Sequence, residues 1–168
     1  TSFPDTNSSN LGSFVSGDSF TYRTYDGYDT SSTATVSLSI YPINDAPSFE
    51  LINSNNETIN HIEIFEDYES KTFSIKHGKI PEDEKLQTVE YFLNPETVEF
   101  ADININRTDG TLTINSIQDL FGSYEFIITA DDNGDDSTVV FEDAAGTVVV
   151  GEDKFTHSFI LDIISVND

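Results

Sequence analysis

Strict alternation of apolar and polar residues is the feature that most constrains the fold of this chain. Between residues 34 and 40, Ala34, Val36, Leu38 and Ile40 alternate with Thr35, Ser37 and Ser39. Phe20 and Tyr22 alternate with polar residues in the same way. Successive side chains of a strand point to opposite faces, so a period of two predicts strands with one buried face. Asp26 and Gly27 lie between the two runs and predict a hairpin with a somewhat long loop.

The same alternation resumes after Pro47 and continues to the end of the sequence. The expected strands cover Phe49–Ile52, Ile59–Phe65, Thr72–Lys76, Thr88–Leu93, Asp102–Ile105, Thr111–Asn115, Tyr124–Ala130 and Lys154–Val166. Ile117–Phe121 is expected to form one short helical turn. The loop Asp131–Asp153 is expected to carry a small extra hairpin of Val139–Phe141 and Thr147–Val150. Many short strands with turn residues between them predict an all-β chain folded as a Greek-key β-sandwich.

An Asn-Asp phrase follows a strand-like run twice, at residues 44–45 and again at residues 167–168. Two expected strands precede each copy, Ser19–Asp26 and Ser32–Ile43 before the first, Ser123–Asp131 and Lys154–Val166 before the second. This internal repeat, with a period of about 120 residues, is typical of tandem β-domains. We therefore expect residues 1–45 to be the C-terminal strands of a preceding repeat, and residues 46–168 to be a complete one.

The first unit is expected to be incomplete, because only its last two strands are present. Two strands cannot bury a full sheet face alone. Residues 1–44 are then expected to pack on the second unit or on another chain, unless the sequence is a piece of a longer protein. The sequence contains no methionine. We therefore expect that it does not start at a native N-terminus, and that any signal or anchor lies outside it.

The charge of the chain is extreme, with 7 basic against 31 acidic residues and a formal net charge of −24. Such a chain repels nucleic acid and anionic membrane surfaces, so neither is an expected partner. An acidic, solvated surface and divalent-cation binding both remain open as explanations. Cysteine is absent, which excludes disulfides, thiolate metal sites and cysteine nucleophiles. No apolar run is long enough to span a bilayer, so membrane insertion is not expected.

The order of these motifs resembles the cadherin-like, Ig-like tandem repeats of large bacterial surface adhesins. The matching residues are Asn44, Asp45, Ala46 and Pro47, then Glu66 and Asp67, Asp83 and Glu84, Gln87 and Val89, Asp109, Gly110, Thr111 and Leu112, Asp131 and Asp132, and Val166, Asn167 and Asp168. The resemblance covers nearly the whole chain. It implies a calcium-binding structural or adhesive module of a long extracellular or cell-surface protein, and not an enzyme. Adjacent repeats, and a cell-surface protein or glycan, are its implied partners.

The resemblance also implies calcium near the domain junctions. The implied ligands are Asp45, Glu66, Asp67, Asp83, Glu84, Asp131 and Asp132. Ca²⁺ takes six to eight oxygen ligands, which one strand cannot supply but a joint between domains can. We therefore expect these carboxylates to gather at the joint around Asp45, where calcium would remove repulsion and fix the interdomain angle. A site at Asp168 is expected to be incomplete without a following domain.

Three other sets of residues invite a different function. Tyr25 and Tyr28 lie near the first hairpin, and aromatic rings on a β-surface can stack on sugars, so a carbohydrate-binding module is the alternative. Carboxylate pairs are unavoidable among so many acidic residues and are no sign of a glycosidase. His61, His77 and His157 are scattered, which favours strand-end or partly buried histidines over a zinc site.

Overall fold

The computed structural model describes residues 16–40, 43–81, 84–134, 139–142 and 148–167. Within these ranges the chain is all-β, and no helix is long and apolar enough to cross a membrane. The strands are β1 (Ser16–Tyr22), β2 (Ala34–Ile40), β3 (Phe49–Ile52), β4 (His61–Phe65), β5 (Lys71–His77), β6 (Glu90–Asn94), β7 (Ala101–Ile105), β8 (Leu112–Ser116), β9 (Gly122–Asp131), β10 (Val139–Glu142), β11 (Val148–Val150) and β12 (Lys154–Ile164).

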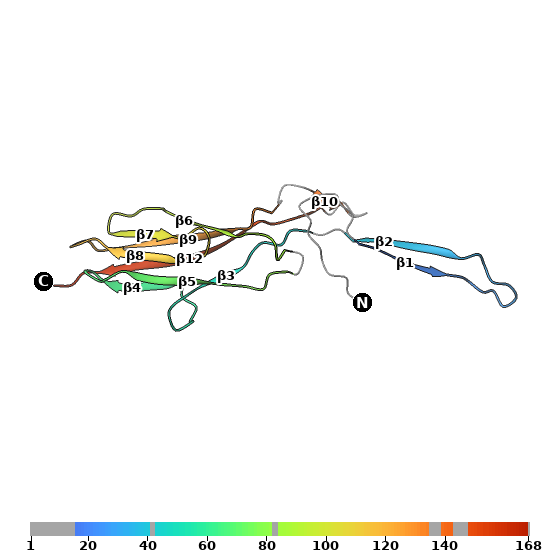
Figure 1. Ribbon diagram of the computed structural model, residues 1–168, viewed down its shortest axis with the longest axis horizontal. Helices are drawn as coiled ribbons and strands as arrows, with labels where there is room; N and C mark the ends of the chain where they lie inside the picture. Colours follow the sequence, from blue (N-terminus) through green and yellow to red (C-terminus); the bar gives the residue numbers. More distant parts are fainter. Residues whose placement is uncertain (1–15, 41–42, 82–83, 135–138, 143–147, 168) are drawn as a thin grey trace.

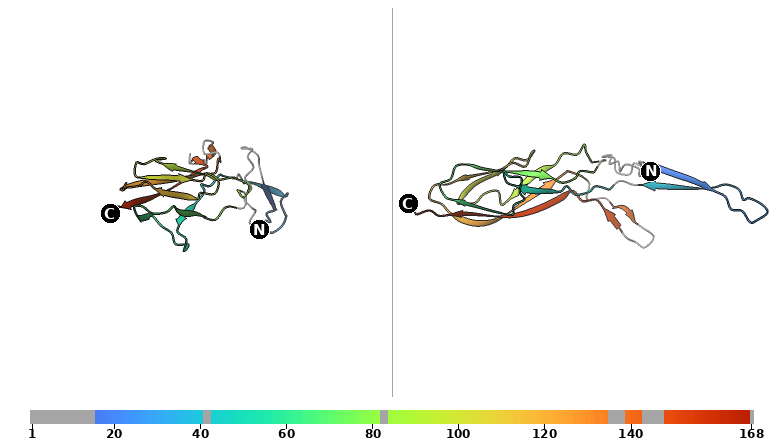
Figure 2. Two further views of the ribbon diagram at one scale, coloured as in Figure 1. Left: turned by 60° about the vertical axis from the view of Figure 1, so that its left-hand side comes forward. Right: turned by 90° about the horizontal axis from the view of Figure 1, so that it is seen from below.

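Strands β3 to β9 and β12 form a sandwich of two four-stranded sheets (Figures 1 and 2). One sheet has the order β4-β12-β9-β6 and the other the order β3-β5-β8-β7. β12 pairs with β9 antiparallel and with β4 parallel. The second sheet and the β12-β9-β6 set reproduce the strand order of an Ig-like Greek-key sandwich, an architecture that cadherins share. The predicted fold class is therefore confirmed.

The core consists of the alternate residues that each strand turns toward the opposite sheet. Its largest fully buried side chains are Tyr91, Phe126, Phe159, Leu51, Leu112, Ile114, Ile128 and Leu161. Phe126 and Phe159 are direct cross-strand partners, and their rings stack with centroids 5.4 Å apart. Burying each such side chain contributes about 1.5–3 kcal/mol, so the alternation in the sequence is what holds the two sheets together.

The Asp109-Gly110 turn joins β7 and β8 at the position that the sequence predicts. Gly110 has a φ of 68°, and a Cβ at this position would collide with Ile75 and crowd the ring of Tyr91. The Oδ1 atom of Asp109 accepts a hydrogen bond from the backbone amide of Thr111 at 2.8 Å. Only glycine meets both the left-handed backbone and the close approach of the core.

Two expectations are wrong in detail. Ile117–Phe121 forms a hydrogen-bonded turn rather than a helical turn, because Leu120 N bonds Ile117 O at 3.2 Å and Gly122 already begins β9. The hairpin of β1 and β2 forms, but its expected buried face is exposed: Phe20 is 54% exposed and Leu38 is 47% exposed. The hairpin extends away from the sandwich, so no described strand covers its face (Figure 1).

The small hairpin within the long loop also forms. β10 and β11 pair antiparallel, with a bulge between Val139 and Phe141. Its predicted strand residue Thr147 lies outside the described residues.

Candidate functional site

The acidic residues that the sequence predicts as ligands lie at two opposite ends of the sandwich. At the entry end, defined by Asp131 and Lys154, β9 finishes and β12 begins, and the two residues are cross-strand partners. At the far end, defined by Phe65 and Ile164, the parallel strands β4 and β12 both finish. The eleven residues of β12 separate the two ends by about 30 Å.

The structure therefore divides the expected cluster in two. Asp45, Glu84, Asp131 and Asp132 lie at the entry end, whereas Glu66 and Asp67 follow β4 at the far end. Asp83 lies outside the described residues. The single joint that the sequence predicts is not formed by these residues, because β4 runs parallel to β12 and carries Glu66 away from Asp45. Whether each of them is a metal ligand stays a prediction.

Asn44 organises the entry end. Its side-chain amide nitrogen donates to the backbone oxygen of Glu152 at 2.6 Å and lies 3.3 Å from Oδ1 of Asp132. Its side-chain oxygen accepts a hydrogen bond from Gln87 at 2.6 Å, and its backbone oxygen accepts one from the amide of Glu152 at 2.9 Å. Asn44 thus connects the linker before β3 with three other segments: the loop before β6, the segment after β9 and the segment before β12.

Carboxylates surround this amide and are themselves buried. Asp132 is 5% exposed and Glu84 is 4% exposed. Glu84 Oε1 accepts a hydrogen bond from the backbone amide of Asp45 at 2.7 Å, and Asp132 Oδ1 accepts one from the amide of Gly134 at 2.9 Å. Burial raises the pKa of Asp132, and the hydrogen bonds from Gly134 and Asn44 oppose that rise. The loops at this end are therefore held by hydrogen bonds to acidic side chains.

Lys154 is a cation of this end. Its Nζ lies 3.1 Å from Oδ2 of Asp153 and 3.6 Å from Oδ2 of Asp131. Among the described residues, no group of three or more His, Cys, Asp or Glu side chains is already arranged to hold a metal ion. The described residues of the entry end therefore form a hydrogen-bonded acidic network.

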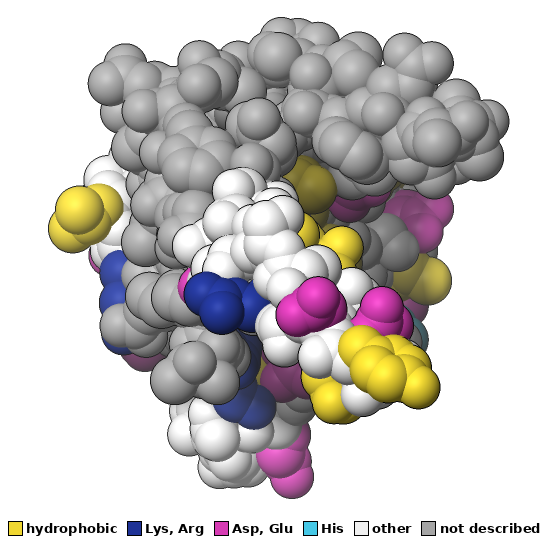
Figure 3. Space-filling model, turned by 90° about the vertical axis from the view of Figure 1, so that its right-hand side faces the viewer, with side chains coloured by type: hydrophobic (Ala, Val, Ile, Leu, Met, Phe, Trp, Pro, Cys, Tyr) yellow, Lys and Arg dark blue, Asp and Glu magenta, His cyan; other side chains and the backbone are white. Residues whose placement is uncertain are grey.

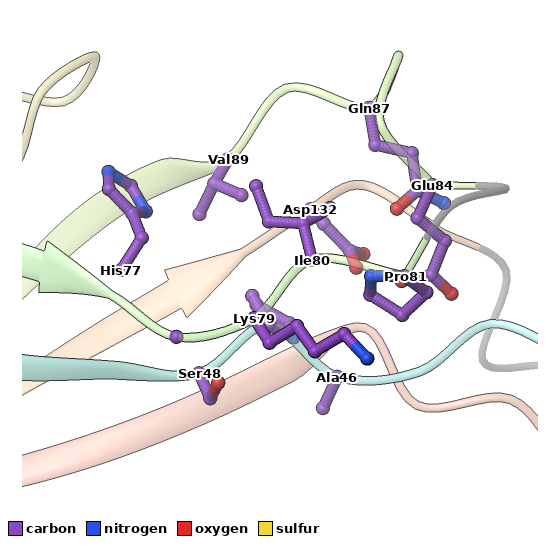
Figure 4. Close-up of a pocket in the computed structure, with 12 residues that line it drawn as sticks. Ala46, Ser48, His77, Lys79, Ile80, Pro81, Glu84, Gln87, Val89 and Asp132 are labelled. Atoms are coloured by element: carbon purple, nitrogen blue, oxygen red, sulfur yellow. The ribbon is translucent and has the colours of Figure 1, made fainter.

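A small pocket opens beside this network (Figure 4). Its lining is Ala46, Pro47, Ser48, His77, Gly78, Lys79, Ile80, Pro81, Glu84, Gln87, Val89 and Asp132. The lining is more apolar than polar, with the two carboxylates of Glu84 and Asp132 at its wall. Burial of Asp132 beside this pocket is the largest cause of its raised pKa, and the nearby charges of Asp153 and Asp131 act in the same direction.

The far end contains one carboxylate in an unusual state. Glu66 is 8% exposed, and its Oε1 accepts a hydrogen bond from the backbone amide of Val166 at 2.7 Å. Its Oε2 atom is buried without a hydrogen-bond partner among the described residues. The next residue, Asp67, has a φ of 60°. An orphaned buried carboxylate oxygen is rare, and it suits a hard cation such as Ca²⁺ that takes oxygen ligands.

Sequence reasoning missed two residues of the entry end as functional. Asn44 was expected only as a boundary marker, yet it makes more contacts with the acidic loops than Asp45 does. Asp153, which is buried and whose carbonyl accepts the amide of Asp132 at 3.1 Å, carried no signal in the sequence. The only available signal for Asn44 was the repeat of its phrase at residues 167–168.

Tyr25 and Tyr28 lie in the loop between β1 and β2, far from both acidic ends (Figure 1). Tyr25 is 68% exposed and Tyr28 is 94% exposed. The hydroxyl of Tyr25 donates to the backbone oxygen of Gly27 at 2.7 Å, and Asp26 Oδ1 accepts from the backbone amide of Tyr28 at 2.8 Å. Viewed from this end, hydrophobic side chains lie beside acidic ones on the surface (Figure 3).

The three histidines have hydrogen-bond partners of the kind expected for strand histidines. His61 Nε2 lies 2.7 Å from Oδ2 of Asp162, and His77 Nδ1 lies 2.9 Å from the hydroxyl of Tyr91. His157 Nε2 lies 3.3 Å from the backbone oxygen of Ile59. They sit on different strands and do not converge on one point.

Comparisons with known proteins identify no family for this chain. No protein-family model matches it, and no curated protein matches it. Among solved structures, a match is found to the structure of mouse clustered PcdhgC3 EC1-3, with a TM-score of 0.32 and 14% identity. The match covers 93% of this chain and 44% of that structure, so the chain spans less than half of its length. The assignment of an Ig-like β-sandwich therefore rests on the strand order and core of this chain itself.

Proposed function

We propose that this chain is a calcium-binding structural and adhesive repeat module of a long extracellular or cell-surface protein, with a non-catalytic role. The observation that carries the proposal is the Oε2 atom of Glu66, a buried carboxylate oxygen without a hydrogen-bond partner among the described residues. A buried carboxylate oxygen that accepts no hydrogen bond is costly, and a cation is the simplest way to offset that cost.

The entry end supports the same proposal through its charge. Asp132 and Glu84 are buried there, and Asp45 and Asp131 lie beside them. Their oxygen atoms are of the kind that Ca²⁺ prefers, and ligands from a neighbouring repeat would complete the coordination. Calcium bound there would supply positive charge to a chain whose formal net charge is −24. A ligand that binds one state better than another stabilises that state by mass action. Calcium that binds the folded, aligned arrangement better than the flexible one would therefore stiffen the joint.

The path of the chain suits a repeat in a row of domains. The chain enters the sandwich near Asn44 at one end, and β12 leaves it at Ile164 at the other (Figure 1). Units joined through these ends would stack end to end, so each acidic end would face a neighbour. Adjacent repeats are therefore the first proposed partners, and a cell-surface protein or glycan the second.

Thermal unfolding in calcium and in chelator tests the proposal. We expect calcium to raise the melting temperature of the 168-residue chain, and isothermal titration calorimetry to detect binding. Glu66→Gln should remove the part of the rise that comes from the far end, and Asp132→Asn the part from the entry end. Glu69→Gln, which alters an exposed carboxylate, is the control. Identical melting curves with calcium and with chelator, together with no heat of binding, would contradict the proposal.

A second candidate function is carbohydrate binding by the loop of the β1–β2 hairpin. It is favoured by the exposure of Tyr25 and Tyr28, whose rings are free to stack on a sugar. A glycan array tests it: hits that disappear in both Tyr25→Ala and Tyr28→Ala support this function. Absence of hits, or hits that survive both changes, rules the loop out as a glycan site.

A further inference from the structure

Asn133 and Gly134 are the one Asn-Gly pair in the 168-residue sequence, and they directly follow the buried Asp132 at the entry end. Asn133 is exposed and has a φ of 57°. An asparagine before glycine is chemically labile, because glycine has no side chain to hinder the attack of its own backbone nitrogen on the preceding residue. The pair is therefore a candidate for a spontaneous covalent change at the entry end.

The reaction of such a pair is deamidation. The backbone nitrogen of Gly134 attacks the side-chain carbon Cγ of Asn133, a bond forms between them, and the Cγ–Nδ2 bond breaks. The leaving nitrogen takes up the proton that Gly134 N gives up and departs as ammonia, which leaves a succinimide ring. Water then opens the ring at either carbonyl and gives aspartate or isoaspartate. Water is the only co-reactant, and it reaches the exposed Asn133.

The folded chain restrains the attacking nitrogen of Gly134. This nitrogen donates a hydrogen bond to Oδ1 of Asp132 at 2.9 Å, and Asp132 is 5% exposed. Attack requires Gly134 N to lose its proton, and loss of a proton beside a buried carboxylate charge is unfavourable. The hydrogen bond must also break before the nitrogen can approach Cγ of Asn133. Asp132 therefore slows the reaction in the folded state.

Asn44 restrains the same glycine by close packing. A Cβ at Gly134 would collide with the side-chain amide of Asn44, so the two residues are in close contact. The amide nitrogen of Asn44 also lies 3.3 Å from Oδ1 of Asp132. Gly134 is therefore held both by the linker and by the carboxylate, and it is released when the entry end opens.

Other described asparagines that precede a small residue lack this combination. The side chain of Asn53 is itself engaged, because its Nδ2 donates to Oε2 of Glu57 at 2.9 Å. Asn115 lies within β8 and pairs with Asp102 of β7, so the sheet fixes the backbone that would have to rotate for attack. Asn133 is therefore the position where deamidation is expected first.

We propose that Asn133 is a deamidation site guarded by Asp132 and Asn44, and that the reaction makes an opening of the entry end permanent. In isoaspartate the main chain runs through the side-chain carbons, so one carbon is added before Gly134. The contact of Gly134 with Asn44 leaves no room for even a Cβ. The lengthened chain therefore cannot restore both this contact and the hydrogen bond to Asp132. This inference is independent of calcium binding.

Peptide mapping by mass spectrometry during long incubation tests the guard, with chelator in every sample. We expect Asn133 in the native 168-residue chain to deamidate at least about tenfold more slowly than in the same chain unfolded in urea. Asp132→Ala, with its fold checked by circular dichroism, should deamidate faster than the native chain. Asp131→Ala is the matched control, because Asp131 accepts from Asn133 N and not from Gly134 N. It should change the rate less.

The guard is overturned by equal rates in native buffer and in urea, or by a rate for Asp132→Ala that is no higher than that for Asp131→Ala. A rate for Asp132→Ala below the native rate would show that the carboxylate acts as the base for the attack, which also overturns it. The comparison between buffer and urea uses the unaltered chain, so it decides the matter even where Asp132→Ala does not fold.

A second measurement tests the permanence of the change. Chain that has been deamidated in urea, refolded in chelator and separated from unmodified chain is compared with Asn133→Asp, which has the new charge but an unaltered main chain. We expect the isoaspartate form to melt at a lower temperature than Asn133→Asp. Asn133→Gln, taken through the same urea treatment, controls for handling and should recover its original melting temperature. Equal melting temperatures of the isoaspartate form and Asn133→Asp would overturn the proposal.

Discussion

The side-chain amide of Asn44 lies 3.3 Å from the carboxylate of Asp132, a residue 88 positions further along the chain. Both groups are buried. This contact closes the entry end of the sandwich, because Asn44 belongs to the linker and Asp132 to the loop that follows β9.

Replacing Asn44 by Ala is expected to lower the free energy of unfolding by roughly 1–3 kcal/mol, because buried partners lose a hydrogen bond. Urea unfolding measures the change. Asn104→Ala, at an exposed position of β7, should change the free energy of unfolding by less than about 0.5 kcal/mol. Equal effects of the two substitutions would contradict the role assigned to Asn44.

Glu66→Gln is expected to leave the stability of the metal-free protein unchanged or to raise it by about 1 kcal/mol. The substitution removes a buried charge whose Oε2 has no partner among the described residues, while the amide oxygen can still accept from Val166 N. Thermal unfolding in chelator is the measurement. A loss of stability in chelator would show that the Glu66 charge is already compensated by the protein.

Gly110→Ala should destabilise the protein more than Gly27→Ala. Both glycines have positive φ, 68° for Gly110 and 102° for Gly27, so both substitutions add backbone strain of about 1–3 kcal/mol. A Cβ at Gly110 also collides with Ile75, whereas a Cβ at Gly27 meets no atom within 4 Å. Denaturant midpoints of the two variants compare the effects, and a larger loss for Gly27→Ala would be inconsistent with this packing.

The protein is expected to lose stability between about pH 10 and pH 12. Burial raises the pKa of Tyr68 to about 12 and that of Tyr91 to about 12, from an ordinary value of 10.0. Their contribution is complete below the pKa of the unfolded chain and is lost as pH rises through the folded-state value. Ultraviolet titration of tyrosinate should show two late-titrating groups, and Tyr91→Phe should remove one of them. A single titration step at the ordinary value would refute the expectation.

Asp162 makes the stability of the protein depend on pH in the acid range. Hydrogen bonds from Ser123 and His61 lower the pKa of Asp162 below its ordinary value of 3.8. Its contribution is present above the unfolded-state pKa and is lost as pH falls through the lower folded-state value. Asp162→Asn should flatten the acid dependence of the unfolding midpoint, and Glu63→Gln on the same sheet face should change it less. Carboxyl NMR titration reports the pKa of Asp162 directly.

Most of the strands could be predicted from alternation alone, because a half-buried strand must repeat every two residues. Phe126, Ile128 and Ala130 are buried in β9, as their spacing indicates. The turn at Ile117–Phe121 could not be predicted, since Asp119 takes a left-handed backbone with a φ of 58° that no periodicity reveals. The exposure of Phe20 was equally invisible, because a sequence shows an apolar face but not what covers it.

By itself the sequence determined that this protein is an all-β chain with a formal net charge of −24 and a repeated Asn-Asp phrase. Tertiary structure alone decided that Glu66 and Asp45 lie at opposite ends of the sandwich. The physical reason is strand direction: Phe65 pairs in parallel with Ile164, so β4 carries Glu66 to the end where β12 finishes. Alternation encodes which face of a strand is buried, but the direction of the strand is fixed only when the sheets assemble.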